Sequence, residues 1–221
     1  MNIIPSLVEQ TARDLFDRIT FLSPHYHQFQ IDIEDGVFIQ NKTLSTNEFV
    51  TYTLDHKDKL SGATLYDFHL MVCDPENHLK AIALLPPKSV GIILMHKTVF
   101  PDYSLITSHY PLFKFGLVLN PEDEVSDVSL PLIQALSVIQ LMTVNPGRQG
   151  QPFIKDVLNK IEQLRNRGFQ GKIYIDGAIN ETTLPLIISL PHKPDVLCPG
   201  SYLAKAPGED LERRVNLLTI T

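Results

Sequence analysis

The sequence predicts a single (β/α)8 barrel over residues 1–221, and three observations lead to that prediction. Short apolar runs of strand length alternate with amphipathic stretches of helix length along the whole chain. This pattern is typical of parallel strands joined by helical crossovers. The runs number eight, as such a barrel requires. A length of 221 residues suits one barrel, and no Gly/Ser-rich, charged or low-complexity segment divides the chain.

Each predicted strand is a run rich in apolar residues that ends near a turn signal. The eight runs are residues 2–5, 26–33, 63–71, 90–95, 113–119, 138–144, 172–175 and 196–198. The clearest helices cover residues 9–22 and 151–167, each with its apolar residues on one face. Gly168 is expected to end the second of them. A doubly wound open sheet is the alternative, but no GxGxxG turn follows the first strand.

The composition favours a globular protein with a small-molecule partner. Apolar residues make up 43% and charged residues 20%, which is enough for a sizeable core. No apolar run approaches the roughly 18 residues of a membrane span, and the N-terminus lacks a secretory signal, so we expect a cytoplasmic protein. A net charge of −6 argues against nucleic acid. Cys73 and Cys198 are too few for a disulfide framework or a Cys-based zinc site.

Polar side chains stand at the end of the second predicted strand. In a barrel, the function lies at the carboxyl ends of the strands. With a period of two, Gln30, Asp32 and Glu34 share one face of this strand, opposite an apolar face that suits the outer helices. We therefore expect the three side chains to point toward the barrel mouth. The alternative is a strand end that opens into a solvated turn at Asp35-Gly36.

Two further predicted strands end in the same way. The third places Asp67, His69 and Met71 on one face, and the seventh is followed by Asp176. Taken singly, His69 could be a core histidine. Together, Asp32, His69 and Asp176 could converge on one axis, and two carboxylates with an imidazole are a plausible set of ligands for a divalent metal.

Three loops at neighbouring strand ends suit an anion. Residues 145–150 follow the sixth strand and open the predicted helix 151–167. Gly177-Ala178 and Gly200-Ser201 follow the seventh and eighth strands, where barrels commonly hold a substrate phosphate. Backbone N–H groups in such loops and at helix starts can surround a phosphate.

Seven segments, in their order and spacing, resemble the ribulose-phosphate 3-epimerase family. The resemblance runs from Ile3 to about Leu203, and its most specific parts are HLMV and VNPGxxGQxFI. The segments are IIPSL, QIDIEDGVFIQNKT, FHLMVCDP, GLVLNP, LMTVNPGRQGQPFI, YIDGAIN and PGSYL.

The resemblance implies a (β/α)8 barrel that epimerises carbon 3 of a ketopentose or ketohexose phosphate through an ene-diolate. In that family a divalent metal, held by two His and two Asp, polarises the substrate oxygens. Carried over, Asp32 and Asp176 would be metal ligands and the two acid/base groups, and His69 a third ligand. Independently of the resemblance, inverting a carbon centre needs a proton removed on one face and delivered on the other, which two carboxylates can do.

The resemblance also implies a set of substrate contacts. The three loops would hold the phosphate, and Ser6, His69 and two methionines would line the sugar site, although core packing also explains the methionines. These residues are Ser6, His69, Met71, Met142, Gly147, Arg148, Gln149, Gly150, Gly177, Ala178, Gly200 and Ser201.

The sequence departs from the family at the metal site. The family motif His-x-Asp-x-Met-Asp-Gly is here replaced by QIDIEDG, so that Gln30 stands for the first histidine and Glu34 for the methionine. A Gln carbonyl is a poor ligand for zinc but acceptable to harder cations. Glu34 could supply the missing ligand and favour manganese or magnesium. The alternative is a weakened or absent metal, with Glu34 solvated.

The phosphate loop departs as well. Arg148 and Gln149 replace an aromatic residue and a glycine. Arg148 could bind the phosphate with two N–H groups, or it could be a solvated surface charge.

We therefore expect an enzyme that epimerises a ketose phosphate of the ribulose 5-phosphate type. We expect its cofactor to be a divalent cation, namely manganese, magnesium, iron or zinc. The sequence leaves open whether the protein forms a homo-oligomer. A hexulose 6-phosphate is an alternative substrate. From another class, the chain could be a catalytically silent barrel that binds a phosphosugar. Retention of Asp32, His69 and Asp176 favours the enzyme, whereas loss of the histidine at position 30 favours the silent barrel. Related barrels that decarboxylate orotidine phosphate carry the motif Asp-x-Lys-x-x-Asp. This sequence does not match that motif, because position 34 is Glu where the motif has Lys.

Overall fold

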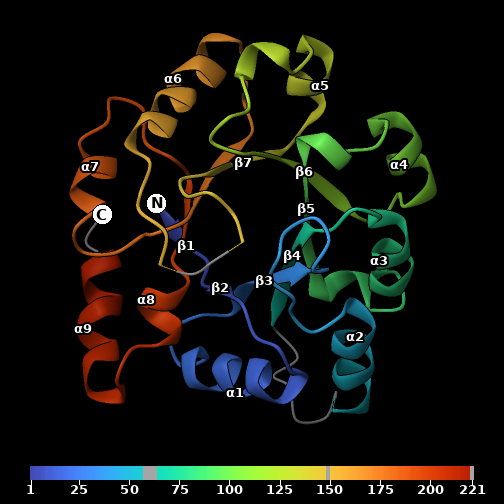
Figure 1. Ribbon diagram of the computed structural model, residues 1–221, viewed down its shortest axis with the longest axis vertical. Helices are drawn as coiled ribbons and strands as arrows, with labels where there is room; N and C mark the ends of the chain where they lie inside the picture. Colours follow the sequence, from blue (N-terminus) through green and yellow to red (C-terminus); the bar gives the residue numbers. More distant parts are fainter. Residues whose placement is uncertain (57–63, 148–149, 220–221) are drawn as a thin grey trace.

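The strands close into a barrel that is surrounded by helices (Figure 1). The computed structural model of the protein describes residues 1–56, 64–147 and 150–219. Within these residues one nine-stranded sheet has the order β1-β9-β8-β7-β6-β5-β4-β3-β2, and every neighbouring pair is parallel. The predicted (β/α)8 barrel is confirmed.

The N-terminal segment closes the ring because it pairs with a different neighbour at each end. β1 (Asn2–Ile3) pairs with β9 (Val196–Cys198), and β2 (Ser6–Leu7) pairs with β3 (Gln28–Glu34). Pro5 lies between the halves; it has no N–H, but its carbonyl accepts a 2.9 Å hydrogen bond from Gln30 N. The first predicted strand, 2–5, is therefore two short halves that reach to Leu7.

The remaining strands lie where the apolar runs predict them, with ends shifted by one or two residues. They are β4 (Leu65–Met71), β5 (Val90–His96), β6 (Lys114–Leu119), β7 (Val138–Met142) and β8 (Lys172–Asp176). The start predicted at residue 63 lies outside the described residues.

Helices connect the strands on the outside of the barrel. The α-helices are α1 (Ala12–Leu22), α2 (Thr46–Asp55), α3 (Pro75–Ile82), α4 (Tyr103–His109), α5 (Leu130–Ala135), α6 (Asn159–Asn166), α7 (Leu184–Ile188), α8 (Ser201–Ala204) and α9 (Gly208–Thr219). Short 3-10 turns lie at η1 (Pro87–Ser89), η2 (Lys97–Val99), η3 (Val125–Asp127) and η4 (Lys155–Leu158).

Both predicted helices begin later than expected. The helix predicted at 9–22 starts at Ala12, because the Thr11 side chain accepts a hydrogen bond from Asp14 N and caps it there. The prediction of 151–167 is wrong in its first half. Ile154 N donates to Thr143 O at 2.7 Å, so residues 151–154 are tied to the end of β7, and helical structure begins only at η4. Gly168, at φ +83°, follows the end of α6 as expected.

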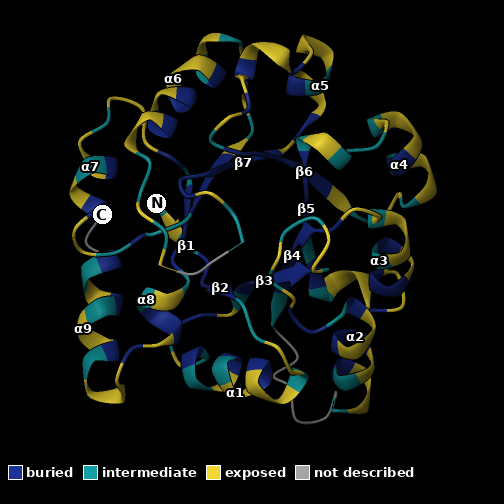
Figure 2. Cartoon of the chain, viewed as in Figure 1, coloured by how far each residue is buried: buried dark blue, intermediate teal, exposed yellow. Residues whose placement is uncertain are grey.

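The core has an outer and an inner part. Figure 2 shows that the barrel strands are mostly buried, whereas the surrounding helices alternate between buried and exposed positions. The outer part joins the helices to the outward side chains of the strands, among them Phe29, Ile31 and Ile33 of β3. The inner part fills the barrel with ten apolar side chains, including Leu94, Val118 and Tyr174. This two-sided burial confirms the alternation predicted for β3. None of the helices in the described part of the chain is long and apolar enough to cross a membrane.

Asp67 is a buried carboxylate at the amino end of β4, below the inner core. Its oxygens accept hydrogen bonds from Gln28 Nε2 at 2.9 and 3.0 Å and from Ile92 N at 2.8 Å. Gly91 makes this approach possible, because a Cβ there would lie 1.9 Å from Asp67 Oδ1. Burial raises the pKa of Asp67 to about 6 in spite of these bonds, which lower it.

The raised pKa of Asp67 predicts a pH-dependent cost to stability. An unfolded Asp has a pKa of about 3.9, so the folded protein binds more protons between about pH 4 and 6, and the free energy of unfolding falls as the pH rises through that window. Asp67→Asn removes the charge, while Gln28 can turn its carboxamide to match. We expect the variant to be more stable at pH 8, on the order of 2 kcal/mol, with the difference vanishing near pH 4. Urea unfolding at both pH values tests this, and a less stable variant at pH 8 contradicts it.

Candidate active site

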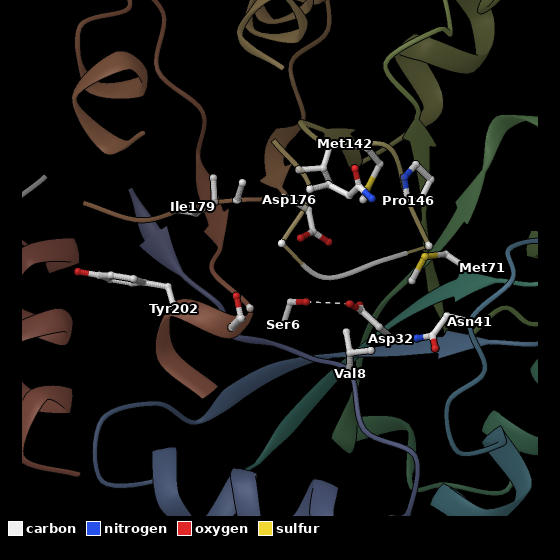
Figure 3. Close-up of a pocket in the computed structure, with 18 of the residues that line it drawn as sticks. Ser6, Val8, Asp32, Asn41, Met71, Met142, Pro146, Asp176, Ile179 and Tyr202 are labelled. Atoms are coloured by element: carbon white, nitrogen blue, oxygen red, sulfur yellow. Dashed lines mark hydrogen bonds between the residues drawn. The ribbon is translucent and has the colours of Figure 1, made fainter. Parts of the chain in front are cut away.

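A cavity of about 420 Å³ opens at the carboxyl ends of the barrel strands (Figure 3). Asp32 at the end of β3 and Asp176 at the end of β8 both line it, as do side chains and backbone from the loops after β7, β8 and β9. The cavity therefore lies at the face where barrels carry their function.

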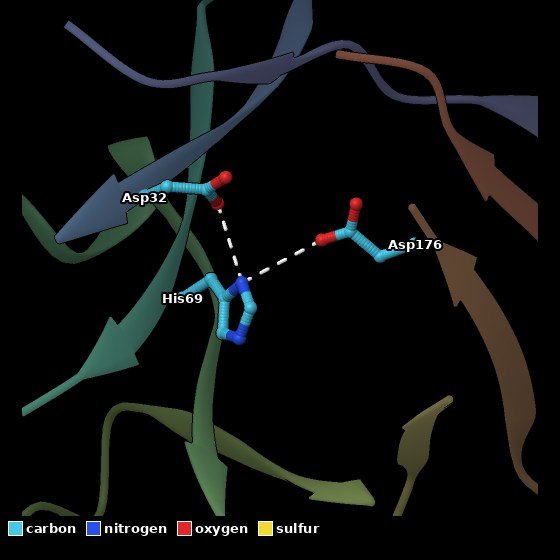
Figure 4. A group of neighbouring side chains, drawn as sticks. All are labelled: Asp32, His69 and Asp176. Atoms are coloured by element: carbon cyan, nitrogen blue, oxygen red, sulfur yellow. Dashed lines mark ion pairs between the residues drawn. The ribbon is translucent and has the colours of Figure 1, made fainter. Parts of the chain in front are cut away.

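Asp32, His69 and Asp176 converge where the barrel interior meets the cavity, as the shared strand faces predict (Figure 4). His69 Nδ1 lies 3.3 Å from Asp32 Oδ1 and 3.5 Å from Asp176 Oδ2. Asp32 and His69 are register partners on β3 and β4, whereas Asp176 reaches them from across the barrel. One ligand atom from each of the three buried residues lies within 4.8 Å of the others.

The electrostatics of this group follow from burial and proximity. Burial disfavours a charge on His69, yet the hydrogen bonds to Asp176 and Asp32 raise its pKa to about 9. Burial and the neighbouring Asp32 raise the pKa of Asp176, while the contact with His69 opposes the rise. Without a bound cation, His69 is thus the positive group between two acids.

His96 at the end of β5 supports His69 from the other side. The two Nε2 atoms lie 2.9 Å apart, and the rings stack at a centroid distance of 5.0 Å. Burial and the charge on His69 hold the pKa of His96 well below its ordinary value, although Asn120 raises it. A neutral His96 can accept the Nε2–H of His69, which leaves Nδ1 of His69 directed at the two carboxylates.

Gln30 lies under the cavity, fully buried, with its carboxamide inside the group. Its Nε2 donates to Asp176 Oδ2 at 2.6 Å and to Asp32 Oδ1 at 2.9 Å, and lies 3.4 Å from His69 Nδ1. Its Oε1 is buried without a hydrogen-bond partner. Two carboxylates, one imidazole and an orphaned carboxamide oxygen form a donor set that fits a divalent cation.

Glu34 lies on the cavity wall and does not belong to that three-residue group. Asn41 Nδ2 donates to its Oε2. Burial, and then the charge of Asp32, raise the pKa of Glu34 to about 7, with Asn41 opposing. Asn41, from the connection between β3 and α2, also lines the cavity and is not among the site residues predicted from the sequence.

The three loops expected to hold a phosphate line the same cavity. Gly147, Gly150, Gly177, Ala178, Gly200 and Ser201 are all on its wall. Gly177 has φ +117°, and a Cβ there would lie 2.7 Å from Val144 Cγ2, so only glycine fits. The expectation that a helix begins directly after loop 145–150 is wrong, because residues 151–154 are not helical. Arg148 and Gln149 lie outside the described residues.

The predicted sugar contacts also reach the cavity. Ser6 Oγ donates to Asp32 Oδ2 at 2.8 Å (Figure 3). Met71 and Met142 line the cavity with little exposure, 3% and 4%. Two thioethers beside the acids make this part of the cavity apolar.

Two buried polar residues in contact with the group, His96 and Gln140, are not among the site residues predicted from the sequence. Gln140 of β7 is fully buried, and its Nε2 lies 3.1 Å from Asp176 Oδ2. Its signal was present in the sequence, because Gln140 is two residues before Met142 and therefore on the same inward face.

Comparisons with known proteins agree with one another. The model of the ribulose-phosphate 3 epimerase family matches residues 2–203. The ribulose-phosphate 3-epimerase of Bacillus subtilis is 32% identical over 168 residues, covering 72% of this chain and 71% of that protein. The enzyme of the same name from Buchnera aphidicola is 28% identical over 221 residues, covering 96% and 91%.

Solved structures share the barrel. Phosphoribosyl anthranilate isomerase from Thermus thermophilus superposes with a TM-score of 0.63 at 13% identity, covering 100% of this chain and 99% of that one. A 3-hexulose-6-phosphate synthase gives 0.60 at 10% identity, covering 100% and 99%. At such identities the likeness concerns the fold alone.

Proposed function

The chain belongs to the ribulose-phosphate 3-epimerase family, and from that premise we propose that it inverts carbon 3 of a ketose phosphate of the ribulose 5-phosphate type. The observation that carries the proposal is the pair Asp32 and Asp176, which line one cavity from opposite sides of the barrel with His69 beneath them. This is the arrangement that inversion of a C–H centre requires.

The two carboxylates exchange roles with the direction of reaction. One takes the proton from carbon 3, the bonding pair moves into the substrate as an ene-diolate, and the other acid delivers a proton to the opposite face. Ser6 donates to Asp32 and fixes the orientation of its carboxylate. His96 holds His69 in place below both acids.

A divalent cation fits this site and would be held by Asp32, His69, Asp176 and the Gln30 carbonyl. When bound, such a cation supplies stabilisation of negative charge on the substrate oxygens. Because a metal-ligating imidazole must be neutral, binding releases the proton that His69 otherwise carries. A carboxamide oxygen in place of an imidazole favours manganese or magnesium over zinc and weakens binding overall.

The loops after β7, β8 and β9 would hold the phosphate through backbone N–H groups, and Arg148 could add a bidentate contact. Met71 and Met142 would exclude water around the reacting carbon.

A hexulose 6-phosphate remains an alternative substrate. A relative from Oryza sativa is named a cytoplasmic isoform, which supports the cytoplasmic location predicted for this chain.

The activity test is a coupled assay with ribulose 5-phosphate and hexulose 6-phosphates, with Mn²⁺, Mg²⁺, Fe²⁺ or Zn²⁺ added to metal-stripped protein. We expect epimerisation of at least one ketose phosphate. Asp32→Asn and Asp176→Asn should each lower kcat on the order of 10²–10⁴-fold, since each removes one proton-transfer group. A chain that binds phosphosugars but epimerises none with any metal would instead be the silent barrel.

A second prediction concerns Gln30. Gln30→His restores an imidazole nitrogen, and we expect it to raise zinc affinity on the order of tenfold or more. Glu34→Gln is the comparison variant, and it should change metal affinity little because Glu34 lies outside the three-residue group and binds Asn41. Isothermal titration of both variants measures this.

Two results would count against the assignment of Gln30. One is a Gln30→His protein whose zinc affinity is unchanged. The other is a Glu34→Gln protein that loses metal binding, which would place Glu34 among the ligands.

A further inference from the structure

Gln140 has no role in the mechanism described so far, yet it is fully buried in the barrel interior. Its neighbours on β7, Ile139 and Leu141, point outward into the core beneath the helices. A buried carboxamide costs free energy unless its polar atoms are bonded, so the contacts of this side chain decide what it does.

Two of those contacts are made with the candidate metal ligands. Gln140 Nε2 lies 3.1 Å from Asp176 Oδ2 and 3.4 Å from His69 Nδ1, and it also lies 3.7 Å from Met142 Sδ. Gln30 Nε2, from β3, approaches the same two atoms at 2.6 and 3.4 Å. Two carboxamides on separate strands therefore converge on one carboxylate oxygen and one imidazole nitrogen.

Each of the two carboxamides has polar partners for its nitrogen but none for its oxygen. Oε1 of Gln30 and Oε1 of Gln140 are each buried with no hydrogen-bond partner. A carboxamide offers two donors at one end and an acceptor at the other, and the two ends are nearly equal in shape. Either side chain can thus present an N–H group or a carbonyl oxygen to the acids without a change in packing.

The spacing of the converging atoms suits a shared cation. The closest separations among them, 2.6–3.5 Å, are those of neighbouring donors around one divalent ion with bonds of about 2.0–2.2 Å, and the ligand atoms of Asp32, His69 and Asp176 all lie within 4.8 Å of one another. Carbonyl oxygens at these positions would repel the carboxylates unless a cation lay between them. N–H groups there attract the carboxylates when no cation is present.

We propose that Gln140 is a further ligand of the metal centre that works as a pair with Gln30. The two carboxamides turn their N–H groups to Asp32 and Asp176 in the metal-free protein and their carbonyl oxygens to the cation in the loaded one. The pair replaces the missing imidazole by two oxygen donors and so directs the site to manganese or magnesium rather than zinc. This inference rests on the metal-dependent function proposed above, but it concerns metal binding, which is measured without substrate.

The test is isothermal titration of metal-stripped protein with Mn²⁺ and Zn²⁺, for wild type, Gln140→Leu and Gln140→Glu. Leucine keeps the bulk and removes both polar ends, so Mn²⁺ affinity should fall on the order of 10–100-fold and Zn²⁺ affinity less. Glutamate restores an oxygen donor, so its Mn²⁺ affinity should equal or exceed that of wild type. Val138→Ala, two residues before Gln140 on the same inward face and away from the cavity wall, is the control and should leave Mn²⁺ affinity unchanged.

A spectroscopic measurement separates a ligand from a packing residue. In Co²⁺-loaded protein, the visible d–d bands should strengthen in Gln140→Leu, because loss of a donor lowers the coordination number. If Gln140→Leu fails to fold, the test uses Gln140→Glu instead. The proposal then predicts that Mn²⁺ raises the Tm of Gln140→Glu more than it raises the Tm of wild type.

Two outcomes overturn the proposal. One is a folded Gln140→Leu protein with wild-type Mn²⁺ affinity and Co²⁺ spectrum, and the other is tighter Mn²⁺ binding by that variant. Either could occur in an active epimerase, and an inactive wild-type protein could still bind Mn²⁺ through Gln140. The failure of this inference and the failure of the proposed function are therefore distinguishable.

Discussion

Two buried acids that face one imidazole are the constraint on which the rest of this site depends. Asp32 and Asp176 are only 4% and 6% exposed, and His69 is not exposed at all. Buried carboxylates destabilise a fold unless donors or positive charge surround them. Ser6, Gln30 and Gln140 donate to them and His69 carries the charge, so the polar interior of the barrel mouth is organised around this one requirement.

The barrel supplies those donors from widely separated parts of the chain. Ser6 reaches Asp32 because the N-terminal segment crosses from β9 to β3 and closes the ring. Asp176 meets His69 only because the ring is closed, since β8 and β4 are not neighbours in the sheet. Apolar side chains of the inner cluster fill the rest of the barrel, so these acids are exposed only where they line the cavity. The contacts that close the ring are thus the same contacts that assemble the site.

Much of this was predictable because strands have a period of two. The inward faces of β3 and β4 follow from alternation alone, and they correctly bring Asp32 and His69 to one side. Residues 151–154 were not predictable in this way. Their apolar spacing favours a helix, but Pro152 disfavours helical backbone at Gln151, and the bond from Ile154 N to Thr143 O holds the segment at the end of β7. Alternation also places Gln140 on the inward face of β7 with Met142, but it does not indicate what Gln140 binds, because His69 and Asp176 lie on other strands far away in sequence.

The central claim is that Asp32 and Asp176 act on opposite faces of the same carbon. Solvent exchange in D₂O, followed by NMR of carbon 3 in each purified epimer of the ketose phosphate, tests it most directly. The account predicts that Asp32→Asn and Asp176→Asn each retain exchange with one epimer only, and with a different one in each variant, without interconverting the two. Exchange of both epimers by either variant, or of the same epimer by both, would contradict it.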